Sequence, residues 1–157
     1  MTLVAAFLIA LSPPVWAPVQ AKNQNRTFQL KDLAKVDLKA NGKVIHAWIM
    51  DTEEKRQEGM MFLTDKEVKA NEGMLFIFPQ PRPLSFWMRN TILPLDIIFL
   101  DASGKVLNIG RGLPFDESGV PAVAPGKYVL ELKVGQAKAY GIKAGLKFAI
   151  PSNLKGK

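Results

Sequence analysis

The segment GMLFIF at residues 73–78, followed directly by Pro79, is an uninterrupted apolar run between a glycine and a proline. A short apolar run with such boundaries is typical of a β-strand that is buried on both faces. From this segment onward, β signals dominate the chain. We therefore expect a fold built mainly from strands, with this segment at its centre.

Shorter β signals flank this run on both sides. In AKVDLKA, residues 34–40, apolar and charged side chains alternate, and Asn41-Gly42 then predicts a tight hairpin turn into a return strand at residues 43–51. Further strands are predicted for LSFWMRN (84–90), LDIIFLD (95–101), KVLNIGRG (105–112), KYVLELKV (127–134) and LKFAIP (146–151).

Helical signals are few and short. Thr52 is a candidate N-cap for a helix that ends at Gly59, and Thr64 with Glu67 forms a capping-box pattern for a single turn. Residues 135–141 predict another short helix. The fold class expected is all-β: a compact β-sandwich or barrel of about seven or eight short strands with two or three short helices.

The beginning of the chain has a different composition from the rest. Residues 1–21 carry no charge, and their apolar run at 3–11 is too short to span a bilayer as a helix. Small residues at Ala17 and Ala21 offer cleavage sites, with Ala21 favoured, so residues 1–21 are expected to be a signal peptide. A periplasmic or secreted protein without a transmembrane anchor after cleavage follows from this interpretation.

Three parts are expected in the exported chain. Residues 22–34 form a polar N-terminal segment, mobile at least from Lys22 to Arg26, residues 35–151 form a single β domain, and residues 152–157 form a basic tail. The chain has no cysteine, which excludes disulfides and cysteine-based metal sites. Its formal net charge is +7, but Lys and Arg are scattered and not interleaved with aromatic residues, so no nucleic-acid partner is expected.

Several strings together resemble the domain-of-unknown-function 192 family. They are EGMMF (58–62), GMLFIF (73–78), FWMRNT (86–91), PLDIIFLD (94–101), and YVLEL (128–132) with Gly135 after it. The resemblance covers about residues 36–151 and implies a compact, mainly β fold, common in bacterial and archaeal proteins and often exported. It implies no activity, because the family has none assigned.

The first string departs from the family pattern at two positions. Glu58 and Leu63 stand where the resemblance implies arginines. An anion-binding site that used those arginines would be altered in this chain. Arg56 and Arg82 are candidates to replace them in space.

Five residues within the apolar strings are the candidate ligand-binding set: Trp87, Arg89, Asn90, Thr91 and Asp96. Strand alternation places Asp96 between buried apolar side chains, where a carboxylate must be paired or its pKa rises. An Arg89–Asp96 ion pair is the structural interpretation, and a ligand cleft covered by the 113–126 loop is the functional one. The predicted function is a small exported binding module for a small ligand or a protein partner, without a cofactor.

Two alternatives remain open. One is a hydrolase-type enzyme with Asp96 as general base, including a glycosidase pair of Asp96 with Glu131, although no nucleophile motif supports catalysis and no catalytic residue is assigned. The other is a Cu(I)-handling protein, since thioether sulfur suits Cu(I). Its candidate ligands are Met60, Met61, Met74 and Met88, with His46 and Met50 on a nearby strand.

Overall fold

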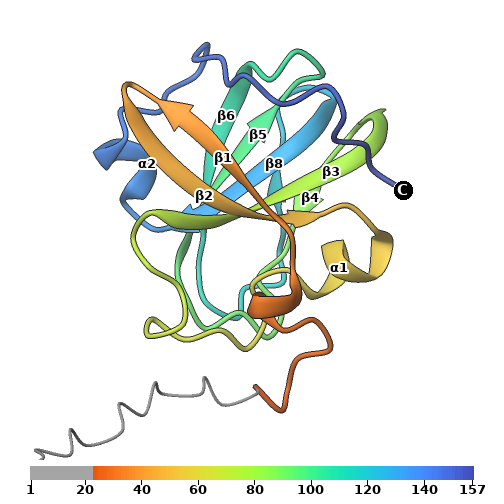
Figure 1. Cartoon of the computed structure of the whole chain (residues 1–157), viewed down its shortest axis with the longest axis vertical. Coiled ribbons are helices and arrows are strands. Elements are labelled where there is room, and N and C mark those ends of the chain that lie inside the picture. Colours follow the sequence, from red (N-terminus) through yellow and green to blue (C-terminus); the bar gives the residue numbers. More distant parts are fainter. Residues whose placement is uncertain (1–22) are drawn as a thin grey trace, which may run out of the picture.

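The computed structural model describes residues 23–157, and its strands form two sheets (Figure 1). The elements are a 3-10 turn Leu30–Asp32, β1 Lys35–Ala40, β2 Lys43–Met50, α1 Glu53–Glu58, β3 Glu72–Arg82, β4 Ser85–Phe86, β5 Leu95–Leu100, β6 Val106–Gly112, β7 Val120–Pro121, β8 Gly126–Lys133 and α2 Gln136–Ala139. The all-β prediction is confirmed. The signal peptide predicted for residues 1–21 lies outside the described residues.

The main sheet has six strands in the order β1-β2-β3-β8-β5-β6, and β4 and β7 form a separate two-stranded sheet. Neighbours in the main sheet are antiparallel except β2 and β3, which are parallel. Within the described part of the chain β1 and β6 do not pair with each other, so the sheet is not a closed barrel. β3 and β8 lie at its centre.

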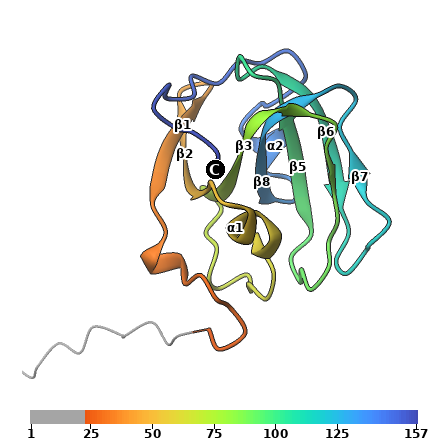
Figure 2. The same ribbon diagram turned by 90° about the vertical axis from the view of Figure 1, so that its right-hand side faces the viewer.

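The main sheet is covered on both faces. On one face, α2 and the C-terminal segment cover a first core, to which Leu75, Leu130 and Phe148 belong. On the other face, the segment after α1 and the strand β4 cover a second core, which includes Met60, Phe76 and Phe99 (Figures 1 and 2). Residues 72–78 of β3 are buried without a break, as the apolar run predicts.

Local signals in the sequence correspond to the observed turns. Asn41 and Gly42 both have positive φ, as a two-residue hairpin between right-twisted strands requires. The Thr52 hydroxyl accepts a hydrogen bond from Lys55 N at the start of α1, and α1 ends at Gly59 with φ 44°. Glu67 reaches back to the backbone N–H of Thr64 at 2.9 Å, which is the capping-box contact, although the segment forms a turn and not a helix.

The prediction of a last strand at residues 146–151 is wrong. Only Lys147 makes a bridge, to Lys105, while Val106 N donates to Leu146 O and Phe148 N donates to Gly104 O. The alternating apolar pattern has another cause: Phe148 is fully buried in the first core. The segment therefore packs as a covering layer and does not extend the sheet.

The expected mobility of Lys22 to Arg26 is also wrong for the part that the structure describes. Arg26 is only 4% exposed, and its Nη1 donates to the carbonyl oxygens of Gly59 and Met61. Its Nη2 lies 3.1 Å from Glu58 Oε2, and that carboxylate also accepts from the backbone N–H groups of Thr27 and Phe28. Polar composition predicted a tail, but an arginine that satisfies buried carbonyls fixes the segment in place.

The basic tail at residues 152–157 is likewise held to the domain. Lys157 N donates to Asp51 O at 2.7 Å, and Arg56 Nη2 donates to the carbonyl oxygen of Lys157 at 2.8 Å. These bonds place the tail beside the start of α1.

Replacing Arg26 tests whether the N-terminal segment stabilises the fold. Arg26→Ala leaves Glu58 without its counter-ion and the carbonyl oxygens of Phe28, Gly59 and Met61 without their side-chain donor. The expected loss in unfolding free energy is about 2–4 kcal/mol by urea denaturation. Lys31→Ala, at an exposed position of the same segment, is the control and should change stability little. Equal stabilities for the two variants would contradict an anchoring role for Arg26.

Candidate functional site

Four of the five predicted site residues lie together after β4. Trp87 and Arg89 are exposed, with the Arg89 guanidinium carbon 5.4 Å from the centre of the Trp87 ring. Asn90 has φ 53°, and its carbonyl accepts a hydrogen bond from Phe62 N at 2.9 Å. Thr91 is buried and its hydroxyl donates to Arg89 O at 3.1 Å. The segment is therefore an ordered loop that presents Trp87 and Arg89 to solvent.

Asp96 does not join this group. It lies on β5, where Ile97 faces the second core and Ile98 faces the first, so Asp96 shares the face of Ile98. Its Oδ2 accepts a hydrogen bond from Ala137 N at 2.9 Å, at the start of α2. The predicted Arg89–Asp96 ion pair is not formed, because the alternation that buries Leu95 and Ile97 turns Asp96 to the opposite side of the sheet.

The 113–126 loop does not cover the predicted cleft. It contributes β7, which pairs with β4 through Ser85–Pro121 and Phe86–Val120. It also holds the segment after β4, since Met88 N donates to Asp116 O. The loop thus supports β4 from the side away from the pocket described next. The prediction that this loop covers a ligand cleft is therefore wrong.

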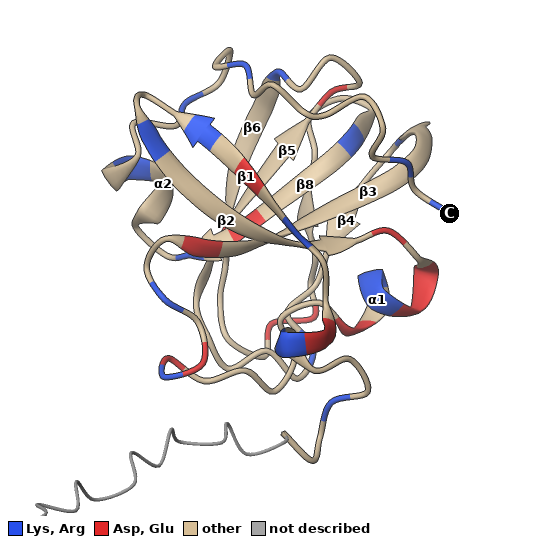
Figure 3. Ribbon diagram, in the orientation of Figure 1, with Lys and Arg blue, Asp and Glu red and all other residues tan. Residues whose placement is uncertain are grey.

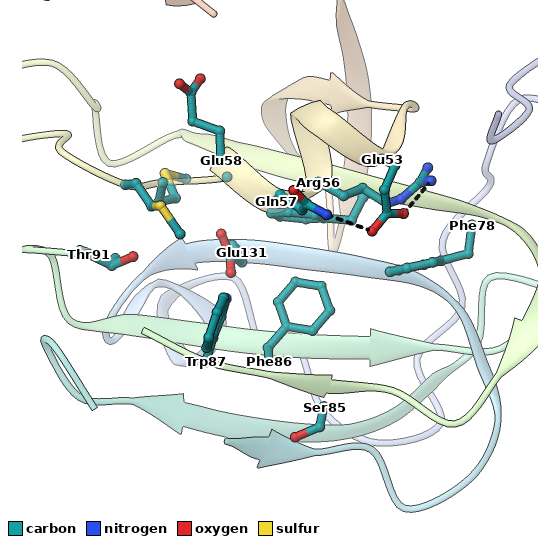
Figure 4. Close-up of a pocket in the computed structure, with 14 residues that line it drawn as sticks. Glu53, Arg56, Gln57, Glu58, Phe78, Ser85, Phe86, Trp87, Thr91 and Glu131 are labelled. Carbon is teal, nitrogen blue, oxygen red and sulfur yellow. Dashed lines mark hydrogen bonds and ion pairs between the residues drawn. The ribbon is translucent and has the colours of Figure 1, made fainter. Parts of the chain in front are cut away.

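A pocket of about 150 Å³ lies between α1 and β4 (Figure 4). Its lining residues are Glu53, Arg56, Gln57, Glu58, Gly59, Met60, Met61, Phe76, Phe78, Ser85, Phe86, Trp87, Thr91 and Glu131. Aromatic rings form much of its wall: Phe86 packs edge-to-face on Phe76 at 4.9 Å between ring centres and on Phe78 at 6.4 Å. We call this space the α1–β4 pocket.

Glu131 lies inside the α1–β4 pocket. It projects from the central strand β8 toward the second core, is 4% exposed, and its Oε2 has no hydrogen-bond partner among the described residues (Figure 4). Burial raises the pKa of the Glu131 carboxyl to about 8. At neutral pH the group is therefore mostly protonated, and it can donate a hydrogen bond or give up its proton when a positive charge approaches.

The other charged side chains of the pocket already have partners. Arg56 donates to the carbonyl oxygens of Asp51 and Ile77 and to the carboxylate of Glu53. Glu58 is paired with Arg26. Among the charged residues that line this pocket in the described chain, Glu131 alone has no counter-ion. Arg56 Nε is also buried without a partner, but the other guanidinium nitrogens of Arg56 are bonded.

A second, more open pocket of about 730 Å³ adjoins the first. The two share Gln57, Glu58, Met61 and Trp87, and the second also takes in Arg89 and Asn90. Of the predicted set, Trp87, Arg89, Asn90 and Thr91 therefore line one or both of these adjoining pockets. Asp96 lines a separate depression with Arg111 and Lys138.

Sequence reasoning gave Glu131 too little weight, naming it only as a possible glycosidase partner of Asp96. Glu131 pairs with Ile97 across the ladder and shares its face, so Glu131 and Asp96 lie on opposite faces of the sheet. The signal was present in YVLELKV, where a single carboxylate interrupts a strand that is otherwise apolar on both faces.

The arginines expected to compensate for Glu58 and Leu63 do not act as predicted. Arg56 lines the pocket but is committed to backbone and Glu53 contacts, and Arg82 is exposed, with its guanidinium 6.0 Å from the Phe78 ring centre. Arg26 instead places a guanidinium against Glu58. Within the described residues, the two arginines beside Glu58 and Glu53 are thus already paired with a carboxylate, Arg26 with Glu58 and Arg56 with Glu53.

Three of the four candidate copper ligands, Met60, Met74 and Met88, are buried in the second core. Met60 and Met61 line the α1–β4 pocket, and the Met88 sulfur lies against Gly112. His46 Nδ1 lies 2.6 Å from Asp37 on the β1–β2 hairpin. Residues 23–157 contain no group of three or more His, Cys, Asp or Glu placed to hold a metal ion.

Comparison with known proteins agrees with this architecture. The family model for the uncharacterized domain-of-unknown-function 192 (DUF192) proteins matches residues 36–150. The chain belongs to the DUF192 family. A crystal structure of a protein of unknown function from Novosphingobium aromaticivorans DSM 12444 has a TM-score of 0.70 and 35% identity, covering 90% of this chain and 94% of that one.

A second solved structure, a putative transcription regulator from Sinorhizobium meliloti 1021, has a TM-score of 0.68 and 30% identity, covering 74% of this chain and 93% of that one. No curated protein matches this chain. Figure 3 shows Lys and Arg dispersed over the ribbon and interspersed with Asp and Glu. Within the described range, no helix is long and apolar enough to cross a membrane.

The pH dependence of stability tests the state of Glu131. The folded pKa of about 8 exceeds the ordinary value of 4.5, so the contribution of this group to stability is fully present below pH 4.5 and is lost as the pH rises to 8. The loss relative to Glu131→Gln should reach up to about 5 kcal/mol.

Urea unfolding of the parent and Glu131→Gln at several pH values between 4 and 9 measures this difference. Glu117→Gln, at an exposed loop position, is the matched control and should follow the parent. Parallel curves for the parent and Glu131→Gln would show that the carboxyl is not desolvated.

Proposed function

We propose that this protein is a small-molecule binding module whose ligand occupies the α1–β4 pocket and extends past Trp87 into the adjoining open pocket. The observation that supports this proposal is the Glu131 carboxyl, buried at the pocket and without a partner for Oε2. A buried polar group without a partner costs about 1–3 kcal/mol, a cost that a functional site sustains more readily than a purely structural core.

Binding is better supported than hydrolysis. Catalysis beside Glu131 needs a nucleophile or an activated water. The Thr91 hydroxyl already donates to Arg89 O, and the Ser85 hydroxyl lies against Gly119 on the side of β4 away from Glu131 (Figure 4). Asp96, the general base of the hydrolase alternative, faces the other side of the sheet. Among the described residues that line the pocket, neither hydroxyl is therefore placed to act as a nucleophile beside Glu131.

A blocking substitution tests the binding proposal. Gln57 is exposed on α1 and lines both pockets, so Gln57→Trp is expected to fill the entrance without disturbing the core. A thermal-shift screen of small amines, alcohols, carboxylates and sugars should find a ligand that stabilises the parent, by about 2.7 kcal/mol at 100 times its Kd. Gln57→Trp should abolish that stabilisation.

Ala139→Trp, at an exposed position of α2, places the same bulk away from the pocket and should retain the stabilisation. A ligand that stabilises both variants equally would bind elsewhere and would contradict the proposed site.

The proposal includes export. The uncharged apolar segment at the start of the chain supports a signal peptide, and cleavage after Ala21 leaves Arg26 and its contacts intact in the mature protein. Binding would then take place in the periplasm or outside the cell.

Expression of the full chain in a Gram-negative host tests export directly. The periplasmic fraction should contain a species whose intact mass begins at Lys22, or at Pro18 if cleavage follows Ala17 instead. Ala21→Asp should block the first cleavage, because the site needs a small uncharged residue. An uncleaved chain confined to the cytoplasm would contradict the proposal.

A further inference from the structure

The α1–β4 pocket is lined by more acidic than basic side chains, although the whole chain is basic. Its charged lining residues are Glu53, Glu58 and Glu131 against the single cation Arg56. Arg56 is neutralised by Glu53 at 3.0 Å, and Glu58 by Arg26 at 3.1 Å. When Glu131 ionises, the charge that the described pocket lacks is therefore a positive one beside its carboxylate.

The walls of the pocket suit a cation as well. Phe76, Phe78 and Phe86 are mutually arranged edge-to-face where they meet, at 85° for Phe76–Phe86 and 77° for Phe78–Phe86. Rings at right angles present both faces and edges to one space, and ring faces attract ammonium and guanidinium groups.

The chain itself uses two rings of this pocket in that way. The Arg56 guanidinium lies 5.1 Å from the centre of Phe78, and the Arg89 guanidinium lies 5.4 Å from the centre of Trp87. Cations already lie over two of the aromatic residues that line the pocket, whereas Phe76 and Phe86, beside Glu131, have no such partner in the described chain.

We propose that the α1–β4 pocket binds a small organic ammonium ion, with its charged nitrogen at the Glu131 carboxylate and its hydrocarbon part against the aromatic wall formed by Phe76 and Phe86. This inference rests on the proposed binding function and names the ligand class. A volume of about 150 Å³ corresponds to roughly five water molecules, which suits an amine of a few carbon atoms. A longer amine extends past Trp87 into the open pocket.

Such a ligand makes binding depend on pH with a definite sign. An ammonium ion binds to the ionised form of Glu131, so a proton is released on binding below pH 8 and affinity rises with pH. Of the other charged groups that line the pocket, Arg56 pairs with Glu53 and its hydrogen bond lowers the pKa of Glu53, while Glu58 pairs with Arg26. A neutral acceptor or a carboxylate requires protonated Glu131 and shows the opposite dependence.

Calorimetric titration with three probes of equal length distinguishes these classes: butylammonium, 1-butanol and butyrate. Butylammonium should bind the parent most tightly, and its affinity should rise by about tenfold per pH unit from pH 6 to pH 8 and then level off. Tetramethylammonium, which has no N–H group, should bind with the same pH trend because charge and ring contacts are sufficient.

Two variants test whether Glu131 itself binds the ammonium ion. Glu131→Gln should bind butylammonium at least tenfold more weakly and without the rise in affinity between pH 6 and pH 8. Glu117→Gln removes an exposed carboxylate of the same type and should behave like the parent. The pH profile of the parent requires no variant, so the inference remains testable if Glu131→Gln does not fold.

Each contrary outcome has a separate meaning. Preference for 1-butanol or butyrate, lost in Gln57→Trp, would overturn the ammonium inference and leave the pocket as a binding site. Butylammonium affinity that is flat with pH, or unchanged in Glu131→Gln, would overturn the role of Glu131. Absence of binding by all four probes would overturn the ammonium inference, and an empty result from the wider ligand screen would overturn the proposed function as well.

Discussion

Burial of the main sheet on both faces is the constraint on which the rest of the molecule depends. β8 is central in that sheet, between β3 and β5, so each of its side chains faces one of two cores. A carboxylate on such a strand is removed from water whichever way it points. Glu131 is therefore desolvated by its place in the ladder, and its protonation state follows from the architecture and not from a neighbouring charge.

Glu131 faces a pocket because the layer that covers the second core leaves a space above it. α1 and the segment after it do not pack against β4 along their whole length, and the space between them is the α1–β4 pocket. Arg26 holds this layer in position through Gly59, Met61 and Glu58. The N-terminal segment therefore supports the pocket through Arg26, which is bonded to residues that line it. This segment lies outside the region matched by the family model.

The local ion pairs explain why Glu131 remains unpaired in a basic protein. Each nearby guanidinium is committed to other acceptors, Arg56 to backbone carbonyls and Glu53, and Arg26 to Glu58 and the carbonyls that it anchors. Glu58 contributes to this arrangement, because its carboxylate at the pocket takes up the Arg26 guanidinium.

Local sequence determined the elements, and tertiary structure decided the site. Asn41-Gly42, Thr52 and the run at residues 73–78 specify a turn, a cap and a buried strand because backbone geometry and side-chain periodicity act over a few residues. The same periodicity could have separated Asp96 from the second core, since Leu95 and Ile97 beside it are the inward residues. Periodicity could not predict which charged side chains pair. Arg26 and Glu58 are 32 positions apart in the sequence, and only the packing of the N-terminal segment on the α1 layer brings their side chains to 3.1 Å.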